Sequence, residues 1–308
     1  MRVIVAGLGV QGHKRRQIAG RDCVATVDPS VEGADYRSVA DVPVAAYDAA
    51  LLCTPDAPKL GLIRLLLERG KHVLVEKPLH AGDDAGLIEL ERLAKQRSLV
   101  CYTAYNHRFE PHFKRMRALV ASGRLGRLYR CRMFYGNGTA RLVRNSEWRD
   151  TGDGVLPDLG SHLLDTASFW FGDVGEEFEI VSCERFENRA PDHVVIASRT
   201  SVPRLELEMT LLAWRNHFTC DLFAELGSAH IQSLCKWGPS TFVHRTRVLP
   251  AGRPPEETET LEQSDPTWAA EYRHFVDLCA RGGATDLSGD RWIGRVMHRL
   301  SGRIGKAT

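Results

Sequence analysis

The first hundred residues alternate short apolar segments with amphipathic ones, and this alternation constrains the fold more than any other feature. The predicted strands are residues 3–6, 23–27, 49–54, 72–75 and 99–103. The predicted helices are residues 10–18, 59–69 and 81–96. Strands that alternate with helices favour a doubly wound parallel sheet with helices on both faces.

The pattern changes near residue 105, where longer segments with strand character begin. These segments are residues 128–135, 178–186, 193–200, 205–214, 217–226 and 230–234. They predict an open, mostly antiparallel or mixed sheet. Helices are predicted at residues 111–122, 160–171, 268–281 and 291–304. Residues 251–265, rich in Pro, Glu and Thr, are predicted to form a surface loop.

The chain length of 308 residues fits two domains. We place an α/β dinucleotide-type domain at residues 1–105 and a second α/β domain at residues 106–308, whose closing helices pack back on the first. The formal net charge of +2 gives no electrostatic case for nucleic acid or membrane binding. The first residues lack the pattern of a secretory leader.

The 8 cysteines are dispersed, with no spacing typical of a zinc site. Most lie in apolar surroundings, as Cys53 does after Leu51 and Leu52. Free buried thiols are typical of a reducing compartment, so we expect a cytoplasmic protein without a bound metal.

A glycine motif follows the first strand and opens the first helix: Gly7-Leu8-Gly9-Val10-Gln11-Gly12. The first glycine permits a tight turn, the second lets a pyrophosphate approach the backbone, and the third allows close helix–strand packing. The N–H groups at the helix start favour phosphate. The motif therefore predicts a dinucleotide site.

Three basic residues follow the motif, and two interpretations of them are possible. Lys14, Arg15 and Arg16 lie close enough in sequence to reach a phosphate. A helix face in contact with solvent accounts better for at least two of them.

Two further strand ends fit a nucleotide. Asp28 ends the second strand, where a carboxylate binds ribose hydroxyls and repels a 2′-phosphate, so we expect NAD in preference to NADP. The alternative is an aspartate that starts a turn before Pro29. Thr54-Pro55 suits a wall beside the nicotinamide ribose, with an ordinary strand-ending turn as the alternative.

Glu76-Lys77-Pro78 ends the apolar segment at residues 72–75. A charged pair at the end of a buried strand is costly unless it faces a crevice, and ligands bind at the carboxyl ends of parallel strands. Pro78 restricts the backbone of Lys77. We interpret Glu76 and Lys77 as groups facing the cofactor, although a lysine that merely leaves a strand for solvent remains open.

A second motif contains Asp158, His162 and Asp165. Spacings of four and three residues place these side chains on one face of a helix. A carboxylate beside an imidazole suits a general base that acts near neutral pH. The alternatives are a helix cap for Asp158 and a core position for His162.

The chain resembles the Gfo/Idh/MocA family, named for glucose–fructose oxidoreductase and inositol dehydrogenase. The shared motifs are Gly7-Leu8-Gly9-Val10-Gln11-Gly12, Thr54-Pro55, Gly70-Lys71-His72-Val73, Glu76-Lys77-Pro78, Asn106-His107-Arg108-Phe109, Gly123-Arg124-Leu125-Gly126 and Asp158-Leu159-Gly160-Ser161-His162. The resemblance implies an N-terminal Rossmann domain and a C-terminal domain whose open sheet forms a homo-oligomer interface.

The resemblance also implies roles for matching residues. Lys77 would bind the reacting oxygen and orient the nicotinamide, and His162 would remove the hydroxyl proton. Asp158 would support a proton relay. Asn106 and Arg108 would line the site, although a structural ion pair explains Arg108 equally well.

Among the departures of the sequence from the family pattern, two stand out. Lys59 stands where the family often has a histidine. The segment at residues 29–47 is too compact for the second helix that is usual in the family. Both departures bear on the adenosine side of the cofactor site.

Tyr135, Trp148, Arg149 and Asp165 are the remaining candidate substrate residues. Aromatic and guanidinium groups suit a polyhydroxylated carbohydrate. We therefore expect an NAD-dependent dehydrogenase of a sugar, polyol or nucleotide-sugar, with a nucleotide-sugar of surface-polysaccharide synthesis as the favoured substrate. The alternatives are a non-catalytic NAD-binding sensor and a reductase of imines or cyclic compounds. For Tyr135, Trp148 and Arg149, the other interpretation is that they belong to a solvated loop.

Overall fold

The computed structural model describes residues 1–147 and 149–304. The chain forms two compact units. Unit 1 contains Met1–Asn106 and Thr267–Gly294, and unit 2 contains His107–Pro266 and the segment that starts at Arg295. The division passes through the last helix, α8 (Ser288–Ile304).

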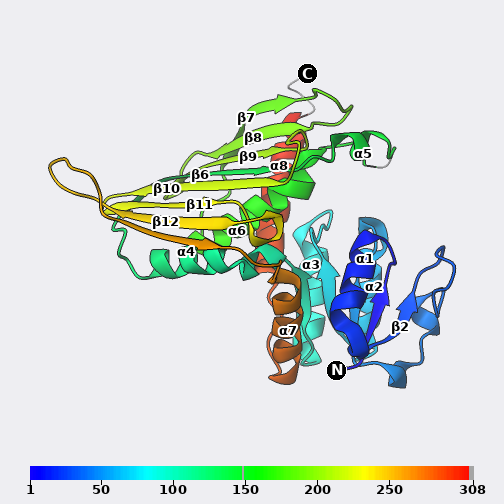
Figure 1. Cartoon of the computed structure of the whole chain (residues 1–308). Coiled ribbons are helices and arrows are strands. Elements are labelled where there is room, and N and C mark those ends of the chain that lie inside the picture. Colours follow the sequence, from blue (N-terminus) through cyan, green and yellow to red (C-terminus); the bar gives the residue numbers. More distant parts are fainter. Residues whose placement is uncertain (148, 305–308) are drawn as a thin grey trace. The chain divides into compact units, whose positions relative to one another are not determined.

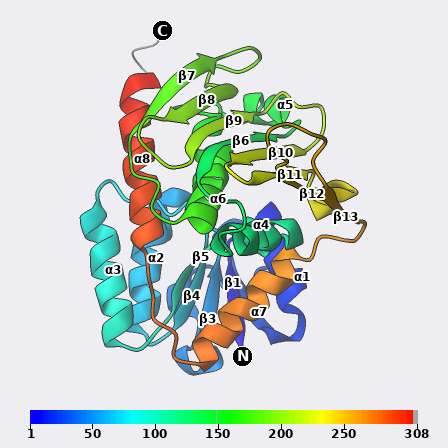
Figure 2. The ribbon, with the colours of Figure 1, turned by 90° about the vertical axis from the view of Figure 1, so that its left-hand side faces the viewer.

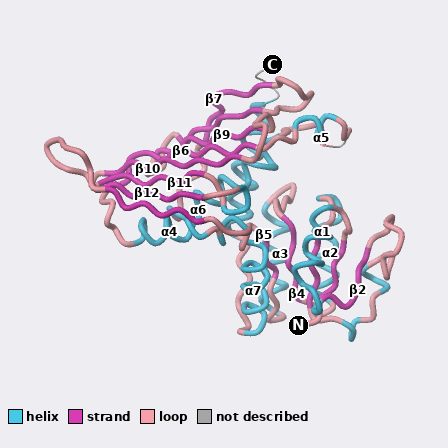
Figure 3. The backbone as a smooth tube through the Cα atoms, viewed as in Figure 1, coloured by secondary structure: helices cyan, strands magenta, loops and turns pink. Residues whose placement is uncertain are grey.

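Unit 1 is built on a parallel sheet of 5 strands in the order β2-β1-β3-β4-β5. Figure 3 draws the strands in magenta and labels β2, β4 and β5. Its strands are β1 (Val3–Ala6), β2 (Cys23–Val27), β3 (Ala49–Leu52), β4 (His72–Glu76) and β5 (Cys101–Ala104). Its helices are α1 (Val10–Ala19), α2 (Asp56–Glu68), α3 (Asp84–Gln96) and α7 (Thr267–Ala280). The expected doubly wound parallel sheet is confirmed.

Helices cover both faces of this sheet because its strands are apolar on both sides. Alternate strand residues, such as Ile4 and Val73, pack against α2 and α3. The residues between them, such as Val5 and Leu74, pack against α1 and α7, where Phe275 is fully buried. Figure 2 shows α2 and α3 on one side of the sheet and α7 on the other.

The segment between β2 and β3 contains no α-helix, as its length predicted. Two 3-10 turns lie there, η2 (Val39–Asp41) and η3 (Val44–Ala46). A single parallel bridge between Val27 and Tyr36 extends the sheet beyond β2. The outer edge of the sheet beside β2 is therefore short.

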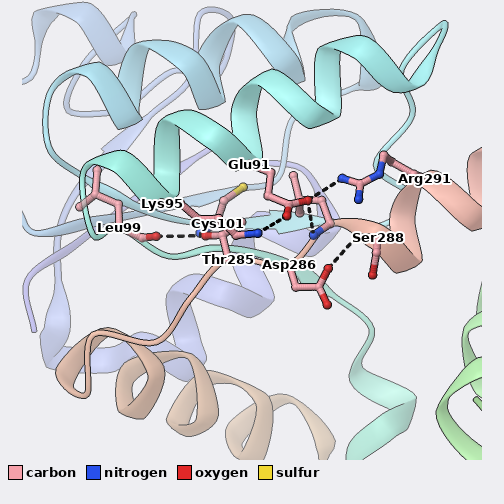
Figure 4. Close-up of polar contacts among 9 residues, drawn as sticks. Glu91, Lys95, Leu99, Cys101, Thr285, Asp286, Ser288 and Arg291 are labelled. Atoms are coloured by element: carbon pink, nitrogen blue, oxygen red, sulfur yellow. Dashed lines mark hydrogen bonds and ion pairs between the residues drawn. The ribbon is translucent and has the colours of Figure 1, made fainter.

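The segment between α7 and α8 closes the opposite edge of the sheet. The Thr285 hydroxyl donates to the Leu99 carbonyl at 3.0 Å and accepts from the Cys101 N–H at 2.8 Å. One side chain thus satisfies the first N–H of edge strand β5 and a carbonyl that lies just before the strand. Glu91 on α3 binds Arg291 and the Leu287 N–H beside this contact (Figure 4).

Unit 2 contains a sheet of 8 strands in the order β13-β12-β11-β10-β6-β9-β8-β7 (Figure 1). All neighbouring strands are antiparallel except β6 and β9. The strands are β6 (Leu128–Gly136), β7 (Phe178–Glu184), β8 (His193–Ser198), β9 (Arg204–Thr210), β10 (His217–Ala224), β11 (Gly227–Gln232), β12 (Ser240–Thr246) and β13 (Glu256–Leu261). The expected mostly antiparallel sheet is confirmed.

The helices of unit 2 other than α8 are α4 (Pro111–Ala121), α5 (Ala140–Arg144) and α6 (Ser161–Phe171). Along β8 and β10, buried residues alternate with partly exposed ones. Such alternation is typical of a sheet with one covered face and one open face.

The predicted surface loop at residues 251–265 was wrong, because it contains β13. This edge strand is charged and almost fully exposed, so it lacks the apolar alternation that identifies a strand. Its pairing with β12 includes a contact of 2.7 Å between Arg245 and Glu256. The predicted strand at residues 230–234 instead begins at Gly227.

All eight cysteines are free thiols. Among the described residues, no helix is long and apolar enough to cross a membrane.

Candidate active site

The glycine motif in unit 1 has the geometry that a dinucleotide requires. Gly7 has φ +90°, and a Cβ there would lie 2.6 Å from the Cys53 carbonyl oxygen. A Cβ on Gly12 would lie 1.8 Å from the Gly7 oxygen, whereas one on Gly9 would meet nothing within 4 Å. The first and third glycines therefore serve packing, and the second leaves open space above the loop.

The start of α1 faces that open space without a competing side chain. Gly9 is the N-cap, no side chain caps the helix, and no acidic residue lies in its first turn. Val10 is 85% exposed and Gln11 is exposed. Backbone N–H groups at a helix start are suited to bind phosphate, so the loop fits a pyrophosphate.

Asp28 is buried at the end of β2, where it braces the glycine loop. Its Oδ2 accepts from the Leu8 N–H at 2.8 Å, and its Oδ1 accepts from Ser30 and Val31, each at 2.9 Å. Burial alone would raise the pKa of this carboxyl, but the three N–H donors hold the pKa below its usual value. Asp28 is therefore ionised at neutral pH, and it starts a turn as well as facing the loop.

Thr54 and Pro55 follow β3, and Pro55 is the N-cap of α2. The Thr54 hydroxyl is buried and has no hydrogen-bond partner among the residues that the structure describes. A buried hydroxyl without a protein partner is uncommon and fits a polar ligand at this strand end.

Glu76 ends β4, and the following Lys77–Pro78 peptide is cis. Contacts hold this tripeptide on both sides of the lysine. Arg15 Nε donates to Glu76 Oε1 at 2.7 Å, and Lys59 Nζ donates to the Pro78 carbonyl at 3.0 Å. Lys59, at the position where the family often has histidine, is 3% exposed and also binds Asp56.

Arg15 is fully buried, so of the three basic residues after the glycine motif it is one that does not lie on a solvated helix face. Its guanidinium contacts Glu76 and lies 2.7 Å from Glu271 on α7, which is also fully buried. Burial alone would lower the pKa of Arg15, but the two carboxylates raise it above its ordinary value. The Trp268 ring lies 4.3 Å from the guanidinium carbon and 4.0 Å from Lys14 Nζ.

Asp158 and His162 lie in unit 2 at the start of α6. Asp158 is within a π-helical turn, η5 (Leu156–Gly160), and His162 is in the first turn of α6. Such widened turns are frequent at functional sites. The His162 ring is 7% exposed and lies edge-on to Tyr135 with centroids 5.8 Å apart.

Tyr135 links these residues to an aromatic cluster. Burial raises the pKa of its phenol, and the charges of Asp158 and Glu110 raise it further. Trp237 lies against Tyr135 with ring centroids 5.6 Å apart, and Lys236 Nζ lies 4.4 Å from the Trp237 ring. The cluster therefore combines aromatic faces with carboxylates and an ammonium.

The sequence interpretation missed Glu110, His107 and Trp237 as parts of this cluster. Burial raises the pKa of the Glu110 carboxyl, and its Oε2 accepts from the Cys235 N–H at 3.2 Å. The signal that was available for Glu110 was an acidic residue directly after the Asn106–Phe109 motif. No local pattern distinguishes Trp237.

Arg108 and Asp165 form a bidentate ion pair within unit 2. Arg108 Nε lies 3.1 and 3.0 Å from the two Asp165 oxygens. Asp165 is 1% exposed; burial raises the pKa of its carboxyl, and Arg108 opposes this shift. Asn106 Nδ2 donates to Thr267 Oγ1 at 2.8 Å and so helps to hold α7.

The structure says less about Trp148 and Arg149, the other two candidate substrate residues. Arg149 is half-buried in a turn where its N–H donates to the Ser146 carbonyl at 2.9 Å. Trp148 lies outside the described residues. Within the described residues, no group of His, Cys, Asp and Glu side chains has the arrangement of a metal site.

Two family profiles match the chain. The profile described as "Oxidoreductase family, NAD-binding Rossmann fold" matches residues 4–105, and "GFO/IDH/MocA C-terminal domain" matches residues 113–230. The chain belongs to the Gfo/Idh/MocA family. Its first domain is thus an NAD-binding Rossmann domain, and the resemblance inferred from the motifs is confirmed.

Several curated relatives of this family member are named dehydrogenases. Trans-1,2-dihydrobenzene-1,2-diol dehydrogenase of Oryctolagus cuniculus is 26% identical over 265 residues, which cover 84% of this chain and 79% of that protein. The NADP-dependent scyllo-inositol 2-dehydrogenase IolW of Bacillus subtilis is 28% identical over 130 residues, or 41% and 36% of the two chains. An uncharacterized oxidoreductase of Schizosaccharomyces pombe is 37% identical, but the match covers 41% of this chain and only 34% of that protein.

Solved structures share the fold across almost the whole chain. A putative NADPH-dependent oxidoreductase from Desulfitobacterium hafniense has a TM-score of 0.82 at 13% identity, covering 99% of this chain and 95% of its own. UDP-N-acetylglucosamine 3-dehydrogenase from Acidithiobacillus ferrooxidans has a TM-score of 0.80 at 19% identity, covering 99% of both chains. At these identities the similarity shows the fold.

Removal of Arg15 tests the buried charge network. We expect Arg15→Met to lower the free energy of unfolding by about 3–5 kcal/mol, because it leaves two buried carboxylates without their cation. The triple variant Arg15→Met/Glu76→Gln/Glu271→Gln should recover much of this loss. Urea unfolding measures both effects.

The matched control is Arg16→Met, which removes the next, exposed arginine of α1. It should change the free energy of unfolding by no more than about 0.5 kcal/mol. Equal unfolding midpoints for Arg15→Met and Arg16→Met would contradict the role given to the network.

Proposed function

We propose that this protein is an NAD-dependent dehydrogenase that transfers hydride between nicotinamide and a hydroxyl-bearing carbon of a sugar, polyol or nucleotide-sugar. The supporting observation is that all three residues Lys77, Asp158 and His162 are present in the sequence. A sensor that only binds NAD needs no proton acceptor. Imine reduction likewise has less need of a base than alcohol oxidation has.

In this proposal, residues of the chain accept the proton of the substrate hydroxyl and bind the reacting oxygen. His162 accepts the proton of the substrate hydroxyl while the carbon–hydrogen bond breaks, which yields a carbonyl group and an imidazolium. Lys77 donates a hydrogen bond to the reacting oxygen, and Asp158 passes the proton onward. Bound NAD supplies the hydride acceptor at nicotinamide C4.

We place the substrate class among rings that carry neighbouring hydroxyl groups. Two relatives are named for a cyclic diol and for an inositol, which share this feature. Trp237 and Asp158 are half-buried, and they suit the apolar face and the hydroxyls of such a ring, respectively. A nucleotide-sugar, such as one used in surface-polysaccharide synthesis, is the preferred member of this class. Arg149 and Trp148 remain candidates for binding its outer part.

We propose NAD in preference to NADP because of the charge on Asp28. Its carboxyl is ionised, since three N–H donors hold its pKa below the usual value. An anion at this strand end repels a 2′-phosphate. We expect a higher kcat/KM with NAD than with NADP, and a smaller ratio in Asp28→Ser. Equal values of kcat/KM in the unaltered protein would contradict this choice.

We also propose a cytoplasmic homo-oligomer that pairs through the open face of the unit 2 sheet. Free thiols fit a reducing compartment. The open face carries cross-strand ion pairs such as Arg130–Glu206 and Arg132–Glu208. Light scattering should give the mass of a dimer or tetramer, and a monomer at micromolar concentration would refute this.

The decisive experiment follows NADH absorbance with a panel of polyols, free sugars and nucleotide-sugars. The unaltered protein should reduce NAD with at least one of them. On that substrate, His162→Ala should lower kcat by about 100- to 10,000-fold while NAD still binds, because the proton acceptor is lost. Lys77→Met should cause a loss of similar size.

His298→Ala is the matched control, since this histidine is exposed on α8. It should leave kcat unchanged. Unchanged turnover in His162→Ala would overturn the mechanism. NAD binding without NADH formation from any panel member would favour the sensor.

A further inference from the structure

His107 lies directly against the proposed base. Its imidazole stacks on that of His162 with centroids 4.1 Å apart and planes 19° apart. Both rings are buried, with exposed fractions of 2% and 7%. Both residues belong to unit 2, so the stack is internal to one compact unit.

Other rings fix the position of this stack. Phe113 lies edge-on to His107 with centroids 5.9 Å apart. Tyr135 contacts both imidazoles, with centroid separations of 5.2 Å to His107 and 5.8 Å to His162. An imidazole otherwise rotates in a broad torsional well about its outer side-chain bond. The stack therefore holds the plane of the His162 ring, in which both ring nitrogens lie.

The stack also affects where a proton binds. Two imidazolium rings in face contact repel, so a proton on one ring disfavours a proton on the other. A neutral ring, in contrast, presents its π face to a cation and attracts it. A neutral His107 therefore stabilises the imidazolium that forms when His162 accepts a proton.

Other titratable and charged groups of unit 2 lie near the stack. Tyr135 is the titratable ring in contact with both imidazoles, and Asp158 and Glu110 bear electrostatically on it. Arg108 is engaged with Asp165, one turn of α6 beyond His162.

We propose that His107 is a positioning residue for His162: its neutral ring orients the base and stabilises the proton that the base accepts. The proposal rests on the proposed function only where it calls His162 the base. The effect of the His107 ring on the protonation of His162 can be measured without a substrate.

The first test is an NMR titration of the histidine rings in His107→Phe and His107→Arg. The resonance of His162 is identified by its absence in His162→Ala. Phenylalanine keeps a flat, uncharged ring, whereas arginine places a permanent charge on the same face. We expect the His162 midpoint in His107→Arg to lie about one pH unit below that in His107→Phe. Equal midpoints would overturn the electrostatic part of the proposal.

The second test measures kcat and KM on the substrate found in the panel. His107→Ala should lower kcat by about 10- to 100-fold with little change in KM, because the base loses its orientation. His107→Phe should restore most of kcat. The acid limb of kcat/KM should lie at lower pH in His107→Arg than in His107→Phe.

These outcomes separate the two proposals. If His162→Ala loses turnover but His107→Ala does not, the positioning role is wrong and the proposed function stands. If His162→Ala keeps its turnover while the NMR midpoints differ, the stack is real but His162 is not the base. Should His107→Ala fail to fold, the Phe and Arg variants still decide the outcome.

Discussion

The buried ion network of Arg15, Glu76 and Glu271 is the interaction on which the rest of unit 1 depends. It joins α1, the end of β4 and α7, and two of its three side chains are fully buried. A buried arginine is tolerated only when carboxylates compensate its charge, so the three positions are not independent. Lys77 follows Glu76 directly, and Lys59 holds the Pro78 carbonyl beyond it. The network therefore fixes where the lysine leaves the sheet.

Local sequence predicted most of unit 1, because each strand is a continuous apolar segment and the glycine motif marks the first turn. Local sequence predicted poorly the features that depend on contacts between distant segments. Arg15 has the sequence context of a solvated helix face, and only the approach of β4 and α7 buries it. Strand β13 was missed because a charged edge strand carries no apolar alternation.

The candidate site shows the same contrast between local motifs and long-range contacts. Gly7, Lys77 and His162 stand in motifs whose chemistry can be interpreted from residue type and spacing. The three rings of His107, Tyr135 and His162 come from separate segments of the chain, and folding alone brings them together. Asp165 illustrates the limit of spacing, because its place on the helix face of His162 serves an ion pair with Arg108.

We propose that Lys77, held by the buried network, lies at the nicotinamide end of the cofactor site. The most direct measurement is amine labelling followed by mass spectrometry, with and without NADH, because it requires no knowledge of the substrate. NADH should protect Lys77 from the reagent and leave Lys95, whose side chain is 50% exposed on α3, unprotected. Equal labelling of Lys77 with and without saturating NADH would contradict this placement of Lys77.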